Sequence, residues 1–295
     1  MFGLLNIDKP AGITSRTVVN RVQYLVRPAK TGHAGTLDPL ATGVLVVAVG
    51  PATRLIPYVQ ATRKTYLATF LLDHQSETLD TEANVQPVAD PLQPAQTEIA
   101  AALPHFVGRL AQVPPAHSAI KVKGRPAYQL ARAGRELQLA PRWITIDRID
   151  LIEYDYPRLQ LDITCSSGTY VRSLGRDLAQ HLGTQAVMTA LQRTAIGDFR
   201  VATACSWGSL ADQSLTAHTL ATWLLPPQVA VDHLPRVQLD ADQIQRLRNG
   251  QAITKSDAAS DGEHAGFDYR GDLVAILTPR DDALWQPIRV FPADS

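Results

Sequence analysis

A single carboxylate, Asp38, stands in a stretch of turn-forming residues, GHAGTLDPLATG at residues 32–43. The proline that follows disfavours the α region for the residue before it, so Asp38 is expected on a loop and not inside a helix. The glycines of the stretch allow tight turns or the close approach of a ligand to the backbone. An acid fixed in such a loop can serve as a nucleophile or a general base, although an Asp-Pro turn before a core strand explains the spacing equally well.

Other residue types that carry chemistry show no comparable pattern. The eight histidines have no metal-ligand spacing with one another or with Cys165 and Cys205, so no metal site is expected. The sequence contains neither GxGxxG nor GxxxxGK[ST], so no nicotinamide or ATP site is expected. Two cysteines do not make a disulfide framework and are expected to be buried thiols.

The composition is that of an ordinary soluble globular protein, with 45% hydrophobic and 19% charged residues among 295. This length predicts one large domain and one small one. No apolar run approaches the ~20 residues that a membrane helix needs. The first residues, MFGLLNIDKP, also lack a basic stretch followed by an apolar one. The protein is therefore expected in the cytoplasm, without a membrane partner.

Charge is distributed unevenly along a chain whose net charge is zero. Residues 1–70 carry eight basic and two acidic groups, and residues 117–148 carry seven basic and two acidic groups. Residues 71–102 hold six acids and no lysine or arginine. This asymmetry predicts a basic face that could bind phosphates, while a mixed, solvated surface is the alternative.

The hydrophobic pattern predicts the elements that hold the Asp38 loop. Residues 4–7 are expected to form a strand, and Thr14 or Ser15 to cap a helix that runs to about residue 26. The continuous β-branched run at residues 44–49 predicts a strand buried on both faces. A short helix to about residue 59 and a strand at residues 63–72 are expected next.

The pattern continues beyond residue 86. Residues 86–96 are typical of a surface loop, and helices are expected at residues 97–103 and 127–133. Residues 159–165 alternate between apolar and polar, which predicts a half-buried strand. Residues 191–196 are expected to form the last strand of the large domain. Helices up to residue 225, a proline linker and short strands that include residues 273–277 and 288–291 complete the chain.

Arg172 stands in the first turn of a helix that is expected to run to His181 and end at Gly183. An arginine there opposes the helix dipole, which a carboxylate partner would offset. We expect Asp38 to be that partner, because a nearby arginine lowers the pKa of a carboxylate and keeps it ionised. The alternative is that Arg172 points to solvent or to a phosphate.

The Asp38 stretch and five further segments, in chain order, resemble the TruB family of tRNA pseudouridine synthases. The five are LLNIDKPAGITS, RKTYLATF, VPPAHSAIKVKGRPAYQLARAG, CSSGTYVRSLGRDLAQHLG and LQRTAIGDF. The segments cover roughly residues 3–200. One motif alone is weak evidence, whereas such an ordered series is not expected by chance.

The resemblance implies an α+β fold. It implies a catalytic domain at residues 1–225, with a mixed, mainly antiparallel central sheet flanked by helices and an RNA-binding insertion around residues 75–148. Residues 229–295 are similar to the small, β-rich, PUA-like RNA-binding domain that ends many bacterial members, although this match is loose.

The resemblance also implies site residues. Asp38 is the catalytic carboxylate, Tyr66 packs on the target base and can relay a proton, and Arg172 holds Asp38. The residues expected to contact the substrate or support its pocket are His33, Tyr170, Leu191, Lys9 and Lys64. Without the resemblance, a strand tyrosine such as Tyr66 is more often an ordinary core residue.

Four positions depart from the pattern of the family. His117 stands where an aromatic residue such as tyrosine is common, and Asp73 where glycine is usual. Glu77 replaces a frequent aspartate, and Gln192 a frequent arginine. These departures leave the chemistry plausible and the detail of the loop after Asp73 open.

The implied function is conversion of uridine 55 in the T loop of tRNA to pseudouridine, by base flipping and without a cofactor. A monomer that acts on the T stem-loop without a guide RNA is expected. A non-catalytic RNA-binding or RNA-folding protein is the main alternative, and a guide-dependent synthase is a second. A phosphoryl-transfer enzyme fits less well, because LDPLATG lacks a second acid to hold Mg²⁺.

Overall fold

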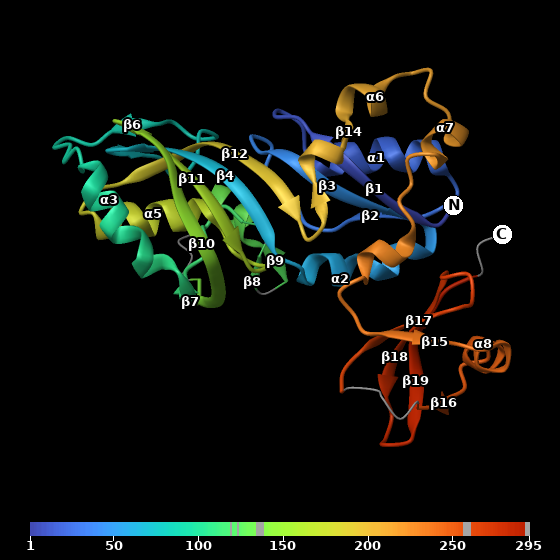
Figure 1. Cartoon of the computed structure of the whole chain (residues 1–295). Coiled ribbons are helices and arrows are strands. Elements are labelled where there is room, and N and C mark those ends of the chain that lie inside the picture. The colour runs from blue at the N-terminus through green and yellow to red at the C-terminus, as the bar shows by residue number, and fades with distance from the viewer. Residues whose placement is uncertain (119, 123, 134–138, 256–260, 293–295) are drawn as a thin grey trace.

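The computed structural model describes residues 1–118, 120–122, 124–133, 139–255 and 261–292. Within these ranges, a large unit is built on a ten-stranded mixed sheet and a smaller C-terminal unit on a five-stranded sheet, as Figure 1 shows. The predicted α+β class, with a mainly antiparallel central sheet flanked by helices, is confirmed. None of the helices in these ranges is long and apolar enough to span a membrane.

One half of the large sheet contains the start of the chain. Strand β1 (Gly3–Lys9) pairs antiparallel with β3 (Thr42–Val49), which also pairs with the short β2 (Thr31–His33). Residues 43–49 of β3 are buried, because helix α1 (Ser15–Val26) covers one face and 3-10 helix η1 (Gly50–Leu55) and helix α2 (Ile56–Ala61) cover the other. The predicted doubly buried strand and the Thr14 cap of α1 are thus present.

The other half of the sheet contains the strand order β12-β4-β11-β10-β7. Their bounds are β4 (Lys64–Leu72), β7 (Gly108–Gln112), β10 (Arg142–Asp155), β11 (Arg158–Cys165) and β12 (Ala186–Ile196). Helix α5 (Val171–His181), helix α3 (Gln96–Ala102) and 3-10 helix η2 (Leu103–Phe106) pack on one face. Gly175 allows the close approach of α5, because a Cβ there would lie 2.2 Å from the Phe70 ring.

The two halves meet where β3 and β12 run parallel. Only two residue pairs form this seam, Thr42 with Gln192 and Gly43 with Arg193. Gly43 has φ +96, and a Cβ there would lie 2.2 Å from the carbonyl oxygen of Arg193. Any other residue would therefore push the two half-sheets apart.

The prediction that residues 191–196 form the last strand of the large domain is wrong. Strand β12 begins five residues earlier, and β13 (Phe199–Arg200) and β14 (Cys205–Ser206) follow it. The chain turns back directly after β12, because β13 pairs antiparallel with the end of that strand, and β14 then pairs in parallel with β1 at the edge of the sheet. A 3-10 helix, η3 (Val201–Thr203), joins the two short strands.

The region expected to be an RNA-binding insertion, residues 75–148, contains α3, η2, β7 and the start of β10, which pack with the large sheet. Its other described elements are short: β5 (His74–Gln75), β6 (Gln86–Pro87), β8 (Lys121–Val122), β9 (Arg125–Pro126) and α4 (Ala127–Arg132). Two of its basic residues, Lys123 and Arg135, lie outside the described residues. The predicted helix at residues 127–133 is present over all but its last residue.

The chain leaves the large unit through α6 (Trp207–Ala211), α7 (Ala217–Ala221) and η4 (Pro227–Ala230). The C-terminal unit contains β15 (Arg236–Gln238), α8 (Ala241–Arg248), β16 (Ile253–Thr254), β17 (His264–Phe267), β18 (Leu273–Pro279) and β19 (Leu284–Val290). Its contact with the large unit is apolar at Phe2 and Phe291, whose rings stack 5.5 Å apart. Arg54 Nη2 also donates a hydrogen bond to the carbonyl oxygen of Val290.

Candidate active site

A pocket of about 400 Å³ opens above the β3–β12 seam. Its lining includes the loop after β2, the first turn of α5, and residues from β4 and β12. The lining residues with side chains suited to chemistry are Asp38, Lys64, Tyr66, Ser118, Thr169, Tyr170, Arg172 and Arg193.

Asp38 lies on the loop between β2 and β3, as its proline neighbour predicts. Its Oδ2 is 3.0 Å from Nη2 of Arg172. The Arg172 side chain is only 7% exposed and that of Asp38 36%, so the pair is more shielded than a surface salt bridge. The predicted contact between Asp38 and Arg172 is therefore present.

The predicted lowering of the pKa of Asp38 is wrong. Burial raises the pKa of this carboxyl above its ordinary value, and the nearby Asp80 acts in the same direction. Arg172 and Lys9 act in the opposite direction but do not outweigh burial. The prediction failed because it considered the arginine and not the burial of the carboxyl in the folded pocket, which cannot be read from the sequence.

Arg172 connects three segments of the chain. Besides Asp38, its Nη1 lies 3.0 Å from Oδ2 of Asp80. Its guanidinium also donates hydrogen bonds to the carbonyl oxygens of Thr78 and His117, at 3.0 and 3.1 Å. A guanidinium with several donors suits this arrangement, because its fork can bind oxygens on different sides at once.

Asp80 is a residue of the site that the sequence did not reveal. Its side chain is 1% exposed and accepts hydrogen bonds from the Thr78 hydroxyl and from the backbone N–H of Glu82. Along the chain, Asp80 is one of six acids in residues 71–102. The threonine two residues before it is the only local signal, and it is typical of many turns.

Lys9 binds the backbone of the Asp38 loop and does not line the pocket. It is fully buried, and its Nζ donates to the carbonyl oxygens of Pro10, Ile13 and Pro39, the last at 3.3 Å. Burial lowers the pKa of Lys9 to about 8, although Asp38 acts to raise it. This geometry fits the supporting role that was one reading of the sequence.

Tyr66, Tyr170 and Leu191 come together in the pocket. Tyr66 is almost fully buried on β4, and burial raises the pKa of its hydroxyl while Arg193 acts to lower it. Tyr170 precedes α5 and is held by Gln112, which bonds its backbone N–H and carbonyl groups at 2.8 and 3.1 Å. Two aromatic side chains and an apolar one in the same pocket offer a surface for a flat ring.

Lys64 and His33 differ in their relation to the pocket. Lys64 lines it, with Nζ donating to the carbonyl oxygens of Thr62 and Gln60, and burial lowers its pKa to about 8. His33, at the end of β2, is not among the lining residues. Burial, followed by the positive charge of Arg193, lowers the pKa of His33.

Arg193 is the second residue that sequence reasoning missed. It is 2% exposed on β12, and it donates from Nε to the carbonyl oxygen of Val44 at 2.7 Å and from Nη2 to that of Gly35 at 3.0 Å. The family pattern drew attention to the neighbouring Gln192, which is only half-buried. The sequence signal that could have identified Arg193 was an arginine within a stretch predicted to be a strand.

The departures from the family pattern have local explanations. His117 Nε2 lies 3.6 Å from Oε1 of Glu77, so two of the altered residues face each other. Asp73 has φ +57, a conformation that favours glycine. Burial acts to raise the pKa of Asp73, but its hydrogen bonds outweigh this and hold the pKa below its ordinary value. The backbone N–H groups of Leu92 and Gln93 are among those donors.

The described residues contain no group of three or more histidine, cysteine or acidic side chains arranged to hold a metal ion. What they do contain is one partly exposed carboxylate held by a buried guanidinium, in a pocket that two tyrosines and one lysine also line. This arrangement can hold a flat polar ring and present an acid to the atoms attached to it.

Solved structures with the same fold include two whose titles name H/ACA particles. One is a structure of an H/ACA RNP bound to a substrate RNA containing 2'-deoxyuridine. The superposition covers 99% of this chain and 86% of the chain in that structure, with a TM-score of 0.73 at 22% identity. The archaeal box H/ACA sRNP Nop10-Cbf5 complex gives a TM-score of 0.74 at 23% identity, with 99% and 87% covered. The chain therefore shares the fold of these two proteins over nearly its whole length.

Sequence comparison identifies the family. The profile described as TruB family pseudouridylate synthase (N terminal domain) matches residues 23–171. A protein of Dehalococcoides mccartyi (strain 195) named tRNA pseudouridine synthase B is 38% identical over 291 residues, with 99% of this chain and 97% of the relative covered. A protein of the same name from Rhodopirellula baltica is 37% identical over 333 residues, with 98% and 94% covered. The chain belongs to the TruB family of pseudouridylate synthases.

Proposed function

We propose that this synthase converts uridine 55 in the T loop of tRNA to pseudouridine, and that it needs neither a cofactor nor a guide RNA. The observation that carries the proposal is the contact between Asp38 and Arg172 inside a pocket that Tyr66 also lines. Relatives named tRNA pseudouridine synthase B, similar over nearly the whole chain, support tRNA as the substrate.

The reaction rearranges one nucleoside. The bond between ribose C1′ and uracil N1 breaks, the base turns, and C1′ joins C5. The proton on C5 is lost and N1 gains one, so the product is an isomer and nothing is oxidised. Asp38, ionised, attacks or stabilises the sugar as the bond to N1 breaks.

The pocket residues receive the base after it leaves the RNA stack. Flipping a nucleotide costs a few kcal/mol, and stacking on an aromatic ring returns about 1 to 3 kcal/mol. In this proposal Tyr66 covers the uracil face and relays a proton, while Tyr170 and Leu191 line the base pocket. Lys64 contacts the substrate and His33 takes a place in the RNA stack.

Regions outside the pocket hold the rest of the RNA. We assign residues 1–225 to the catalytic domain and residues 229–295 to a PUA-like domain that binds RNA. The basic groups of residues 1–70 and 117–148 provide charge for the phosphates of the stem. Lys9 acts through the Asp38 loop, because its ammonium group holds the carbonyl of Pro39.

The direct test is incubation of the protein with an unmodified T stem-loop RNA, followed by mapping of pseudouridine. We expect modification at the position of uridine 55 alone, without added guide RNA or cofactor. A non-catalytic RNA-binding protein would bind this RNA without forming pseudouridine in it. Formation only after addition of a guide would favour the guide-dependent class.

A further inference from the structure

The pocket is assembled from two half-sheets that share only a short ladder of backbone pairs. Asp38 belongs to the half with β2 and β3, whereas Tyr66 and Leu191 belong to the half with β4 and β12. Two residue pairs form the ladder between these halves. The separation of Asp38 from Tyr66 therefore depends on whatever fixes this seam.

Arg193 crosses the seam with its side chain. It lies on β12, yet its guanidinium donates to Val44 on β3 and to Gly35 in the loop that leads to Asp38. Tyr66 on β4 is the register partner of Arg193 across the β12–β4 ladder, and Arg193 acts to lower the pKa of the Tyr66 hydroxyl. Arg193 thus lies on the strand beside Tyr66, while its side chain reaches the segment that carries Asp38.

The charges around Arg193 do not explain its burial by a gain in stability. None of the ion pairs among the described residues includes it. The groups whose pKa is lowered by the charge of Arg193 include Lys9, Lys64 and His33, and none of these is acidic. A buried cation without an anionic partner costs folding free energy, so its contacts are best explained by the geometry that they impose.

We propose that Arg193 is a positioning residue, which fixes the Asp38 loop and the Tyr66 ring relative to each other across the seam. The inference rests on the proposed function of this pocket. Arg193 acts through the two groups that it holds. Its planar fork matters, because a point charge reaches one carbonyl where the guanidinium reaches two.

The test compares Arg193→Lys with Arg200→Lys, an exposed arginine on the neighbouring β13, in a steady-state assay on the T stem-loop RNA. We expect kcat of Arg193→Lys to fall about 100-fold, as small displacements of reacting groups do, while KM stays within about threefold. Arg200→Lys should behave as the wild type. Thermal unfolding of each variant gives the folded fraction for which kcat is corrected.

A second variant, Arg193→Ala, opens a space that guanidinium ion can enter from the pocket. Added guanidinium should restore kcat of this variant about tenfold or more without improving Arg200→Lys, because it replaces the missing fork. If Arg193→Ala does not fold, Arg193→Lys decides alone.

Corrected turnover of Arg193→Lys close to that of Arg200→Lys would overturn the proposal. So would a loss confined to KM, or a folded Arg193→Ala that guanidinium does not improve. These failures differ from a failure of the proposed function, in which the wild-type protein itself forms no pseudouridine in the same RNA.

Discussion

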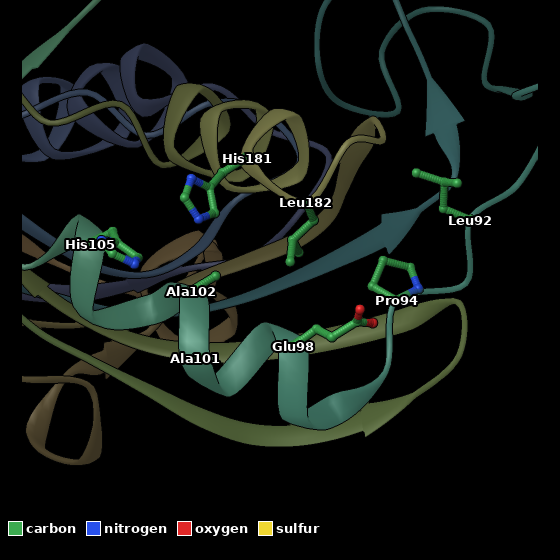
Figure 2. A pocket seen from close by; sticks show the side chains of 8 residues that line it. All are labelled: Leu92, Pro94, Glu98, Ala101, Ala102, His105, His181 and Leu182. Atoms are coloured by element: carbon green, nitrogen blue, oxygen red, sulfur yellow. The ribbon is translucent and has the colours of Figure 1, made fainter.

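Two hollows of nearly equal size lie at opposite ends of helix α5. The pocket around Asp38 has a volume of about 400 Å³ and contains Arg172 from the first turn of the helix. The other hollow, shown in Figure 2, has about 420 Å³ and contains His181 from the last turn. Both hollows hold a carboxylate and basic side chains, so neither size nor residue type separates them.

The contacts of these side chains separate the two hollows. Arg172 is buried and contacts oxygens from three segments distant in the chain. In the second hollow, Glu98 accepts from Ala95 N–H at the start of its own helix, and His105 and His181 are exposed, with ring centroids 5.0 Å apart. A buried charge held from several directions is fixed in place, and this is what chemistry requires.

The largest difference between the two hollows should appear when the carboxylate of each is replaced by its amide. Asp38→Asn should lower turnover by about 10⁴-fold or more and leave RNA binding intact, because it removes the reacting group but not the surface. Glu98→Gln, the matched change in the second hollow, should leave turnover as it is. Single-turnover kinetics and filter binding measure both, and near-normal turnover of Asp38→Asn would remove the distinction.

Asp80→Asn should have the next largest effect. It leaves the buried Arg172 with one carboxylate where there were two, so we expect turnover to fall about 100-fold and the free energy of unfolding to fall by about 3 kcal/mol. Kinetics and urea denaturation measure the two quantities. A variant as active and stable as the wild type would show that the pair at 3.0 Å contributes little.

The pH dependence gives a smaller, signed effect. Asp38 must be ionised, and its pKa is raised by burial, so activity should be lost as pH falls through a midpoint above the ordinary aspartate value of about 3.9. Asp80 is one of the groups that raise this pKa. Asp80→Asn should therefore shift the acid limb of the kcat profile to lower pH. A shift to higher pH would contradict the assignment.

The smallest effect should come from emptying the second hollow. A His105→Ala/His181→Ala variant should keep kcat and KM within about twofold of the wild type, as exposed substitutions away from a site usually do. The steady-state assay on the T stem-loop RNA is sufficient. A large loss in either constant would mean that the second hollow also serves the reaction.

The sequence predicted those parts of the molecule that depend on neighbours in the chain. The apolar run of β3, the Thr14 cap of α1 and the loop position of Asp38 follow from local patterns, and so does a cation near the start of α5. The family motifs then indicated which acid to examine.

Sequence reasoning did not find Asp80 and Arg193, because the residues that they contact are far away along the chain. Asp80 meets Arg172 across 92 positions, and Arg193 meets Val44 and Gly35 across 149 and 158. No pattern along the chain encodes such contacts. The raised pKa of Asp38 was missed for the same reason, because burial is a property of the folded pocket.

A structure of the protein bound to a T stem-loop RNA with 5-fluorouridine at the target position tests the central claim most directly. We predict that the fluorinated base leaves the loop and lies in the pocket against Tyr66, with its ribose facing Asp38 while Arg172 still holds that carboxylate. A target base that remains stacked in the RNA, or that occupies the hollow between α3 and α5, would contradict the account.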